Sequence, residues 1–97
     1  MKFNSVAVLG LGYIGLPTAA MFASQKVNVI GVDVNQNIVE TINQGKIHFI
    51  EPGLEVLVRY AVDERYLKAT MIVEPADAFL VAVPTPLNTE GYKPNLA

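Results

Sequence analysis

The spacing of three glycines near the amino terminus constrains the fold of this chain more than any other feature. The motif Gly10-Leu-Gly12-Tyr-Ile-Gly15 follows an apolar run at residues 6–9 and precedes a stretch rich in helix-forming residues at 16–24. A glycine loop between a buried strand and a helix is typical of a βαβ unit that binds a dinucleotide. Gly10 permits the tight turn, Gly12 lets the backbone approach a phosphate, and Gly15 lets the helix pack closely.

An acidic residue at the end of the second apolar run supports the same interpretation. Asp33 follows the run at residues 27–32, and an acid roughly 20 residues beyond such a fingerprint accepts hydrogen bonds from ribose hydroxyls. A carboxylate there repels a 2′-phosphate, and no arginine follows within the next turn, so we expect NAD rather than NADP. The alternative is that Asp33 only caps the next turn.

The two variable positions inside the fingerprint, Tyr13 and Ile14, are candidate phosphate contacts through their backbone. Their N–H groups lie at the start of the expected helix, where the helix dipole and unpaired donors favour an anion. The alternative is that both side chains simply pack against the sheet.

Composition and charge exclude several other classes of protein. The chain has 97 residues, of which 52% are hydrophobic, and a net charge of −2. This predicts one folded domain, and without a basic stripe we expect no nucleic-acid partner. Cysteine is absent and His48 is the only histidine, so we expect no disulfide, no thiol nucleophile and no metal site within this span.

The stretch between Lys2 and Lys26 carries no charge and could be taken for a signal peptide or membrane segment. It also contains polar residues, three glycines and Pro17, and its two halves differ in character. A strand followed by a helix explains these features better. We therefore expect no membrane association and a cytoplasmic protein.

Apolar runs and helix signals alternate along the rest of the chain. We expect strands at residues 5–9, 27–32, 67–71 and 78–83, and helices at 13–24, after Asn35, and after Glu51-Pro52-Gly53. Gly45 suits the end of the second helix. The pattern predicts an α/β fold, a Rossmann-type parallel sheet of strand order 3-2-1-4 with helices on both faces.

This sheet is truncated relative to a complete doubly wound fold, because two further strands are lacking. We therefore interpret residues 1–97 as a single domain that is part of a longer protein, whose substrate-binding and catalytic domains lie outside this chain.

Helical spacing also predicts particular core residues. In the third helix the positions i, i+3, i+4 and i+7 are Leu54, Leu57, Val58 and Ala61. In the first helix we expect Met21 and Phe22 in the core. His48 is interpreted as a loop residue, and Glu51 as a favourable charge at a helix start rather than a catalytic acid.

Thr85 follows the fourth strand, between Pro84 and Pro86. Ligands of open α/β sheets bind outside the carboxyl ends of strands, near the switch point. Thr85 is thus a candidate contact to the nicotinamide half of the cofactor. The alternative is a stiff turn whose threonine satisfies only local backbone groups.

Four motifs in order give this chain a specific resemblance. They are Gly10-Leu-Gly-Tyr-Ile-Gly-Leu-Pro-Thr-Ala-Ala20, Gly31-Val-Asp-Val-Asn35, Glu51-Pro-Gly-Leu54 and Val81-Ala-Val-Pro-Thr-Pro86. Together they resemble the amino-terminal part of the UDP-glucose/GDP-mannose dehydrogenase family. Pro17-Thr-Ala-Ala20 is more similar to the branch that acts on UDP-N-acetyl-D-mannosamine than to the UDP-glucose branch.

The resemblance implies a two-step oxidation of a nucleotide sugar, from the C6 alcohol through an aldehyde to a carboxylate, with two NAD reduced. The second step uses a cysteine beyond this span, so the resemblance implies no catalytic residue here and an inactive fragment. Only cofactor roles carry over, to Gly10, Gly12, Tyr13, Ile14, Gly15, Asp33 and Thr85.

Competing hypotheses are a dehydrogenase acting on UDP-glucose or another nucleotide sugar, another Rossmann dehydrogenase, and a non-enzymatic NAD-binding module. We also expect a homo-oligomer, because the fourth strand leaves an open sheet edge.

Overall fold

Four parallel strands form one sheet in the computed structural model, which describes residues 4–82. The elements in chain order are β1 (Ser5–Leu9), α1 (Gly15–Ser24), β2 (Asn28–Val32), α2 (Gln36–Asn43), α3 (Leu54–Asp63), β3 (Leu67–Thr70) and β4 (Ala78–Val81). The strand order is β3-β2-β1-β4, which confirms the predicted α/β sheet and its order. The expected helix at residues 13–24 begins two residues later, at Gly15.

Strand β1 occupies the centre of the sheet because its residues are apolar on both faces. It pairs with β2 from Ser5↔Asn28 to Leu9↔Val32, and with β4 from Val6↔Ala78 to Leu9↔Val81. Its three middle residues are buried. The carboxyl ends of β1, β2 and β4 therefore lie side by side, at the edge where ligands of parallel sheets bind.

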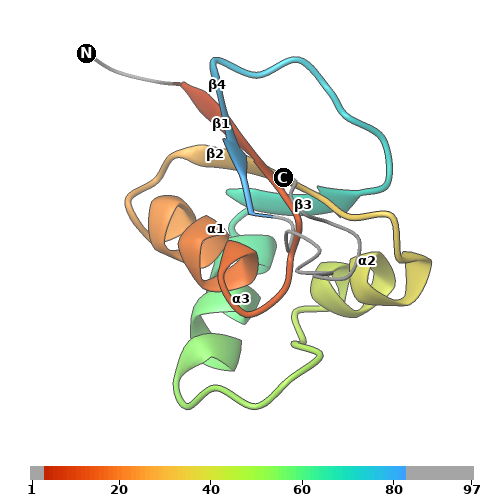
Figure 1. The fold of residues 1–97 in the computed structure, drawn as a ribbon. Helices are drawn as coiled ribbons and strands as arrows, with labels where there is room; N and C mark the ends of the chain where they lie inside the picture. The colour runs from red at the N-terminus through yellow and green to blue at the C-terminus, as the bar shows by residue number, and fades with distance from the viewer. Residues whose placement is uncertain (1–3, 83–97) are drawn as a thin grey trace, which may run out of the picture.

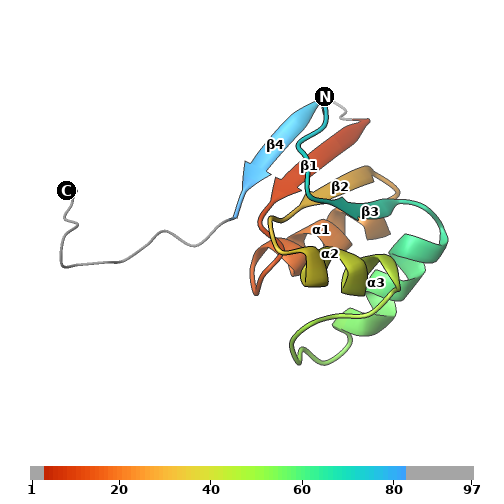
Figure 2. The ribbon, with the colours of Figure 1, turned by 90° about the vertical axis from the view of Figure 1, so that its right-hand side faces the viewer.

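All three helices within residues 4–82 lie on the same face of the sheet, as Figures 1 and 2 both show. Helix α3 contacts both α1 and α2, and each helix contacts β3 or β2. The sequence predicts helices on both faces, whereas the connection from β3 to β4, residues 71–77, contains no helix. The second face thus carries no helix from the described residues.

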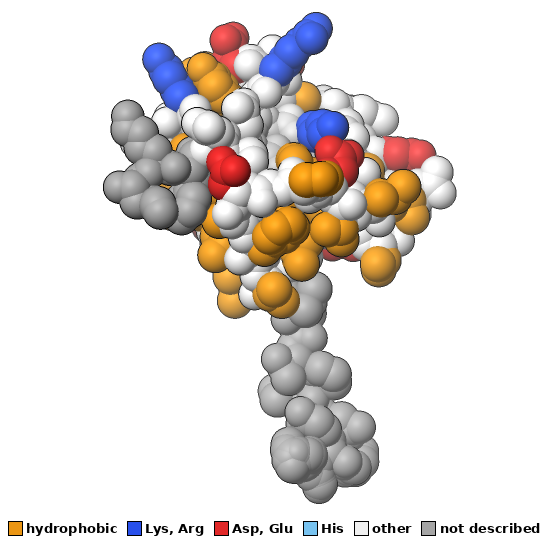
Figure 3. All heavy atoms as spheres, turned by 90° about the horizontal axis from the view of Figure 1, so that it is seen from above, with side chains coloured by type: hydrophobic (Ala, Val, Ile, Leu, Met, Phe, Trp, Pro, Cys, Tyr) orange, Lys and Arg blue, Asp and Glu red, His pale blue; other side chains and the backbone are white. Residues whose placement is uncertain are grey.

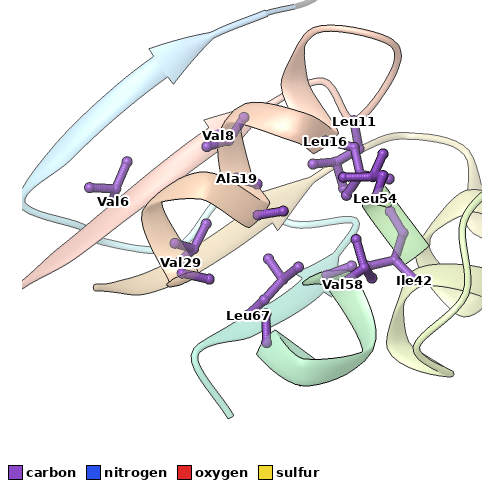
Figure 4. Packing of buried hydrophobic residues seen from close by; sticks show 14 of the residues in the cluster. Val6, Val8, Leu11, Leu16, Ala19, Val29, Ile42, Leu54, Val58 and Leu67 are labelled. Atoms are coloured by element: carbon purple, nitrogen blue, oxygen red, sulfur yellow. The ribbon is translucent and has the colours of Figure 1, made fainter. Parts of the chain in front are cut away.

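The hydrophobic core fills the space between the sheet and the helices. Figure 4 shows Val6, Val8 and Val29 of the sheet, Leu16 of α1 and Val58 of α3, which belong to one buried cluster. Leucine and valine side chains at these places have less than 4% of their surface exposed, and each contributes about 1.5–3 kcal/mol on burial.

Two predicted core residues lie on the surface instead. Met21 in α1 is 56% exposed and Leu57 in α3 is 43% exposed, whereas Phe22 packs against the core as expected. Each helix packs against the sheet through one side only. Residues next to the buried stripe on that side therefore face solvent. The stripe of α3 is Leu54, Val58 and Ala61.

The predicted ends of α2 and the predicted start of α3 are confirmed in their geometry. The Asn35 side chain accepts hydrogen bonds from the N–H groups of Asn37, at 2.9 Å, and Ile38, at 3.2 Å. This caps the start of α2. Gly45 follows α2 with a φ of 80° and Gly53 precedes α3 with a φ of 84°. These left-handed conformations favour glycine.

Candidate functional site

The loop from β1 to α1 is held against the sheet by contacts that require glycine. Gly10 has a φ of 102°, and its N–H donates to the Val32 carbonyl at 2.8 Å. A Cβ at Gly15 would lie 1.7 Å from the Gly10 carbonyl oxygen, whereas a Cβ at Gly12 would meet nothing within 4 Å. The backbone at Gly12 therefore borders open space at the amino end of α1.

Three N–H groups of this loop can bind a ligand. Within residues 4–82, those of Gly12, Tyr13 and Ile14 donate no hydrogen bond. They precede α1, whose positive end and unpaired donors favour an anion such as a phosphate. The side chains of Tyr13 and Ile14 are 76% and 72% exposed, so the alternative that both pack against the sheet is wrong.

Asp33 links the glycine loop to the turn that follows β2. Its Oδ2 accepts from the Leu11 N–H at 3.0 Å, and its Oδ1 accepts from the Asn35 N–H at 2.9 Å. The turn-capping contact that was the alternative role therefore exists. Each carboxylate oxygen has a second lone pair, so these two bonds leave Asp33 able to accept from ribose hydroxyls while its orientation is fixed.

A pocket of about 510 Å³ lies beside Asp33 at the carboxyl ends of β1 and β2. Three residues that the fingerprint singles out, Gly10, Gly12 and Asp33, line it. The rest of the lining is apolar and includes Val34, Ile38 and Val73. The sequence pattern did not indicate these three as site residues. Val73 comes from the β3–β4 connection, and only the folded chain brings it here.

Gly31 is a further residue whose role the sequence did not indicate. It lies in the middle of β2, and a Cβ there would come within 2.9 Å of the terminal carbons of Leu11. Leu11 is fully buried. Gly31 thus makes room for the side chain that anchors the glycine loop in the core.

The remaining candidate residues lie outside the pocket. His48 and Glu51 are in the loop between α2 and α3, and the His48 ring lies edge-on to Phe49 with centroids 4.9 Å apart. The Glu51 carbonyl accepts from the Leu54 N–H at 3.0 Å, which places Glu51 at the start of α3. Thr85 lies outside the described residues. Among residues 4–82 no helix has the length and apolarity needed to cross a membrane.

A parallel sheet with free N–H groups at a helix start, an open glycine and an oriented acid defines a dinucleotide-binding domain of the Rossmann type. The sequence model of the UDP-glucose/GDP-mannose dehydrogenase family, NAD binding domain, matches residues 4–97. The chain belongs to this family, and residues 4–97 match its NAD-binding domain.

Several known proteins are similar to this chain. The UDP-N-acetyl-D-mannosamine dehydrogenase of Campylobacter jejuni is 63% identical over 95 residues, which cover 98% of this chain and 23% of that protein. The NDP-N-acetyl-D-galactosaminuronic acid dehydrogenase of Ralstonia nicotianae is 58% identical over 97 residues, covering 100% of this chain and 23% of that protein.

Solved structures of relatives share the fold. The UDP-N-acetyl-mannosamine dehydrogenase Cap5O from Staphylococcus aureus superposes with a TM-score of 0.85 at 43% identity, covering 89% of this chain and 21% of its own. GDP-mannose dehydrogenase from Pseudomonas aeruginosa gives a TM-score of 0.84 at 34% identity, and the match covers 90% of this chain and 21% of that protein. The chain thus spans about a quarter of the curated relatives that it matches.

Proposed function

We propose that this domain holds NAD for a nucleotide-sugar 6-dehydrogenase that oxidises UDP-N-acetyl-D-mannosamine to UDP-N-acetyl-D-mannosaminuronate with two NAD. The observation that carries the cofactor part is the set of free N–H groups at Gly12, Tyr13 and Ile14, next to the pocket that Asp33 lines. The sugar part is supported by the names of relatives such as the Campylobacter jejuni enzyme.

The glycine loop and the pocket beside it have separate proposed roles in binding NAD. The N–H groups of Gly12, Tyr13 and Ile14 bind the pyrophosphate, and Gly10 and Gly15 shape the loop that presents them. Asp33 accepts from the adenosine ribose hydroxyls, and Val34, Ile38 and Val73 contact the adenine ring through the apolar wall of the pocket. Thr85, outside the described residues, contacts the nicotinamide half.

Bound NAD supplies a hydride acceptor to the reaction. The sugar-binding groups and the cysteine that the two-step oxidation needs lie outside this span, so residues 1–97 form one cofactor domain that is inactive alone. This is supported by the 23% share of each relative that the chain covers. UDP-glucose or another nucleotide sugar is the alternative substrate, and an NAD-binding module without catalysis is the alternative role.

We also propose that the protein acts in the cytoplasm as a homo-oligomer. The uncharged stretch near the amino terminus forms β1 and α1, whose buried residues belong to the core, so the fold accounts for its apolar character without a signal peptide. Within residues 4–82, β4 lies at the edge of the sheet and offers a surface for association.

The preference for NAD over NADP tests the role of Asp33. By calorimetry we expect the chain to bind NAD more tightly than NADP, because the Asp33 carboxylate repels a 2′-phosphate. Asp33→Asn removes this charge and keeps one acceptor oxygen, so the preference should fall by roughly 10-fold, or about 1.4 kcal/mol. Asp63→Asn, at the exposed end of α3, is the matched control. Equal binding of NAD and NADP by the unaltered chain would contradict the proposal.

The substrate is tested with the longer protein that contains this domain. We expect NADH formation with UDP-N-acetyl-D-mannosamine to exceed that with UDP-glucose or GDP-mannose. A higher rate with UDP-glucose would favour the alternative substrate, and no turnover with any nucleotide sugar would favour the non-enzymatic module.

A further inference from the structure

The ring of Tyr13 contacts a residue far along the chain. Its centroid lies 4.7 Å from that of Phe49, with the ring planes inclined by 48°. Phe49 is half-buried, packs against the hydrophobic core and also meets the edge of the His48 ring. The glycine loop is thus tied through an aromatic pair to the segment that precedes α3.

Within the described residues, the backbone of residues 12–14 makes hydrogen bonds only with α1. The carbonyls of Gly12 and Ile14 accept from the first turns of α1, at 3.1 Å from Leu16 N and 3.2 Å from Thr18 N. These bonds join the loop to its own helix. The N–H groups of residues 12–14 donate no hydrogen bond within the described residues, and Gly12 borders open space. The ring pair with Phe49 links Tyr13 to a segment outside this loop and helix.

We propose that Phe49 is a positioning residue for the phosphate-binding loop, because its ring holds Tyr13 so that the loop N–H groups face the pyrophosphate before the cofactor arrives. The inference rests on the proposed function and deepens it. It assigns to the segment before α3 a part in binding the cofactor, although Phe49 lies outside the pocket that Asp33 lines.

The expected size of the effect follows from the strength of such a pair. An aromatic pair changes an equilibrium by a factor of about 2 to 10. When the binding-competent loop is only partly populated, the apparent Kd rises by the reciprocal of that population. Loss of the ring contact should therefore weaken binding of the pyrophosphate by up to about 10-fold.

A double-mutant cycle in the chain tests this inference. Tyr13→Leu, Phe49→Leu and the double variant are titrated by NMR with ADP-ribose, which has the pyrophosphate, and with adenosine, which lacks it. We expect each single variant to weaken ADP-ribose binding by about 2- to 10-fold and to leave adenosine binding unchanged. The double variant should bind ADP-ribose about as tightly as the single variant with the lower affinity, because both substitutions remove the same contact.

Two further variants separate positioning from general stability. Ile50→Ala alters an adjacent side chain that is 93% exposed and should not change ADP-ribose binding. Phe49→Tyr keeps the ring and should restore affinity relative to Phe49→Leu. Because the Tyr13 side chain is 76% exposed, Tyr13→Leu gives a test that does not depend on the core packing of Phe49.

Three results would overturn the inference alone: losses that multiply in the double variant, equal weakening of adenosine, or no loss with Tyr13→Leu. Failure of the unaltered chain to bind ADP-ribose would instead overturn the proposed function, and this inference with it.

Discussion

The three fingerprint glycines occupy three different environments. Gly10 adopts a left-handed φ, Gly15 lies where a Cβ would overlap the Gly10 carbonyl, and Gly12 borders open space. The first two are therefore required by the fold. Gly12 is required only if something else fills the space beside it, and in a dinucleotide-binding domain the phosphates fill it.

Alanine substitutions at these two positions should consequently affect different properties. Gly15→Ala should lower stability, whereas Gly12→Ala should mainly weaken NAD binding. Gly15→Ala brings a methyl group to 1.7 Å from a backbone oxygen that cannot rotate away, so we expect a loss of more than about 3 kcal/mol in the free energy of unfolding. Gly12→Ala should change this free energy by less than about 1 kcal/mol and weaken NAD binding.

Urea unfolding followed by circular dichroism measures the stability of both variants, and calorimetry measures NAD binding. Each variant serves as the control for the other, because both add one methyl group to the same loop. Equal destabilisation by the two substitutions would show that the environments of Gly12 and Gly15 do not differ in this way.

A side chain from a helix covers part of the outer edge of strand β3. Strand β3 pairs with β2 through alternate residues, which leaves the N–H and carbonyl of Ala69 directed outward. The Asn43 side chain satisfies both, donating to the Ala69 carbonyl and accepting from its N–H, each at 2.9 Å. An amide from α2 thus occupies part of this edge and opposes pairing with another strand.

Asn43→Ala should destabilise the chain by about 1–3 kcal/mol, because it leaves two partly buried backbone groups without partners. Thermal unfolding measures the change. Asn37→Ala replaces another exposed asparagine of the same helix, whose side chain makes no hydrogen bond within residues 4–82, and should cost less than about 0.5 kcal/mol. Similar losses from both variants would show that the contact with Ala69 contributes no stability.

Elements were predicted to within two residues wherever a local cause defines their ends. Asn35 caps α2, Gly45 ends it, and Glu51-Pro52-Gly53 precedes α3 as expected. The exposure of Met21 and Leu57 was predicted wrongly, because the width of a buried stripe depends on what packs against the helix. Helical periodicity gives the direction of the stripe but not its width.

At the scale of the whole molecule, one face of the sheet carries no described helix. The pairing register places Leu9, Val32 and Val81 together on that face. Val81 is 69% exposed, and Phe79 and Ile72 are also exposed. Figure 3, seen from above the sheet, shows hydrophobic side chains gathered on this side. Such a surface beside the edge of β4 favours association.

We therefore expect the chain to self-associate, and Val81→Lys to weaken that association by roughly 10-fold, because a charge on an edge strand opposes pairing. Sedimentation equilibrium over a range of concentrations gives the dissociation constant. Met21→Lys adds the same charge on the helix-covered side, at a residue that is 56% exposed, and should leave it unchanged. A chain that remains monomeric at high concentration would contradict the proposed oligomer.

The sequence by itself determined the strand order, the class of cofactor site and the loop that forms it. These depend on local causes: apolar runs of strand length, caps, and glycines whose spacing is set by the turn from β1 into α1. The family was likewise indicated by four motifs in order, and the matching of residues 4–97 to its NAD-binding domain confirmed it.

Only the tertiary structure decided which residues surround that loop. Val73 reaches the pocket from the β3–β4 connection, Gly31 makes room for Leu11, and Phe49 meets the ring of Tyr13. Each contact joins residues that are far apart in the chain. Such contacts form only when distant segments pack together in the folded chain, and no local pattern in the sequence specifies that packing.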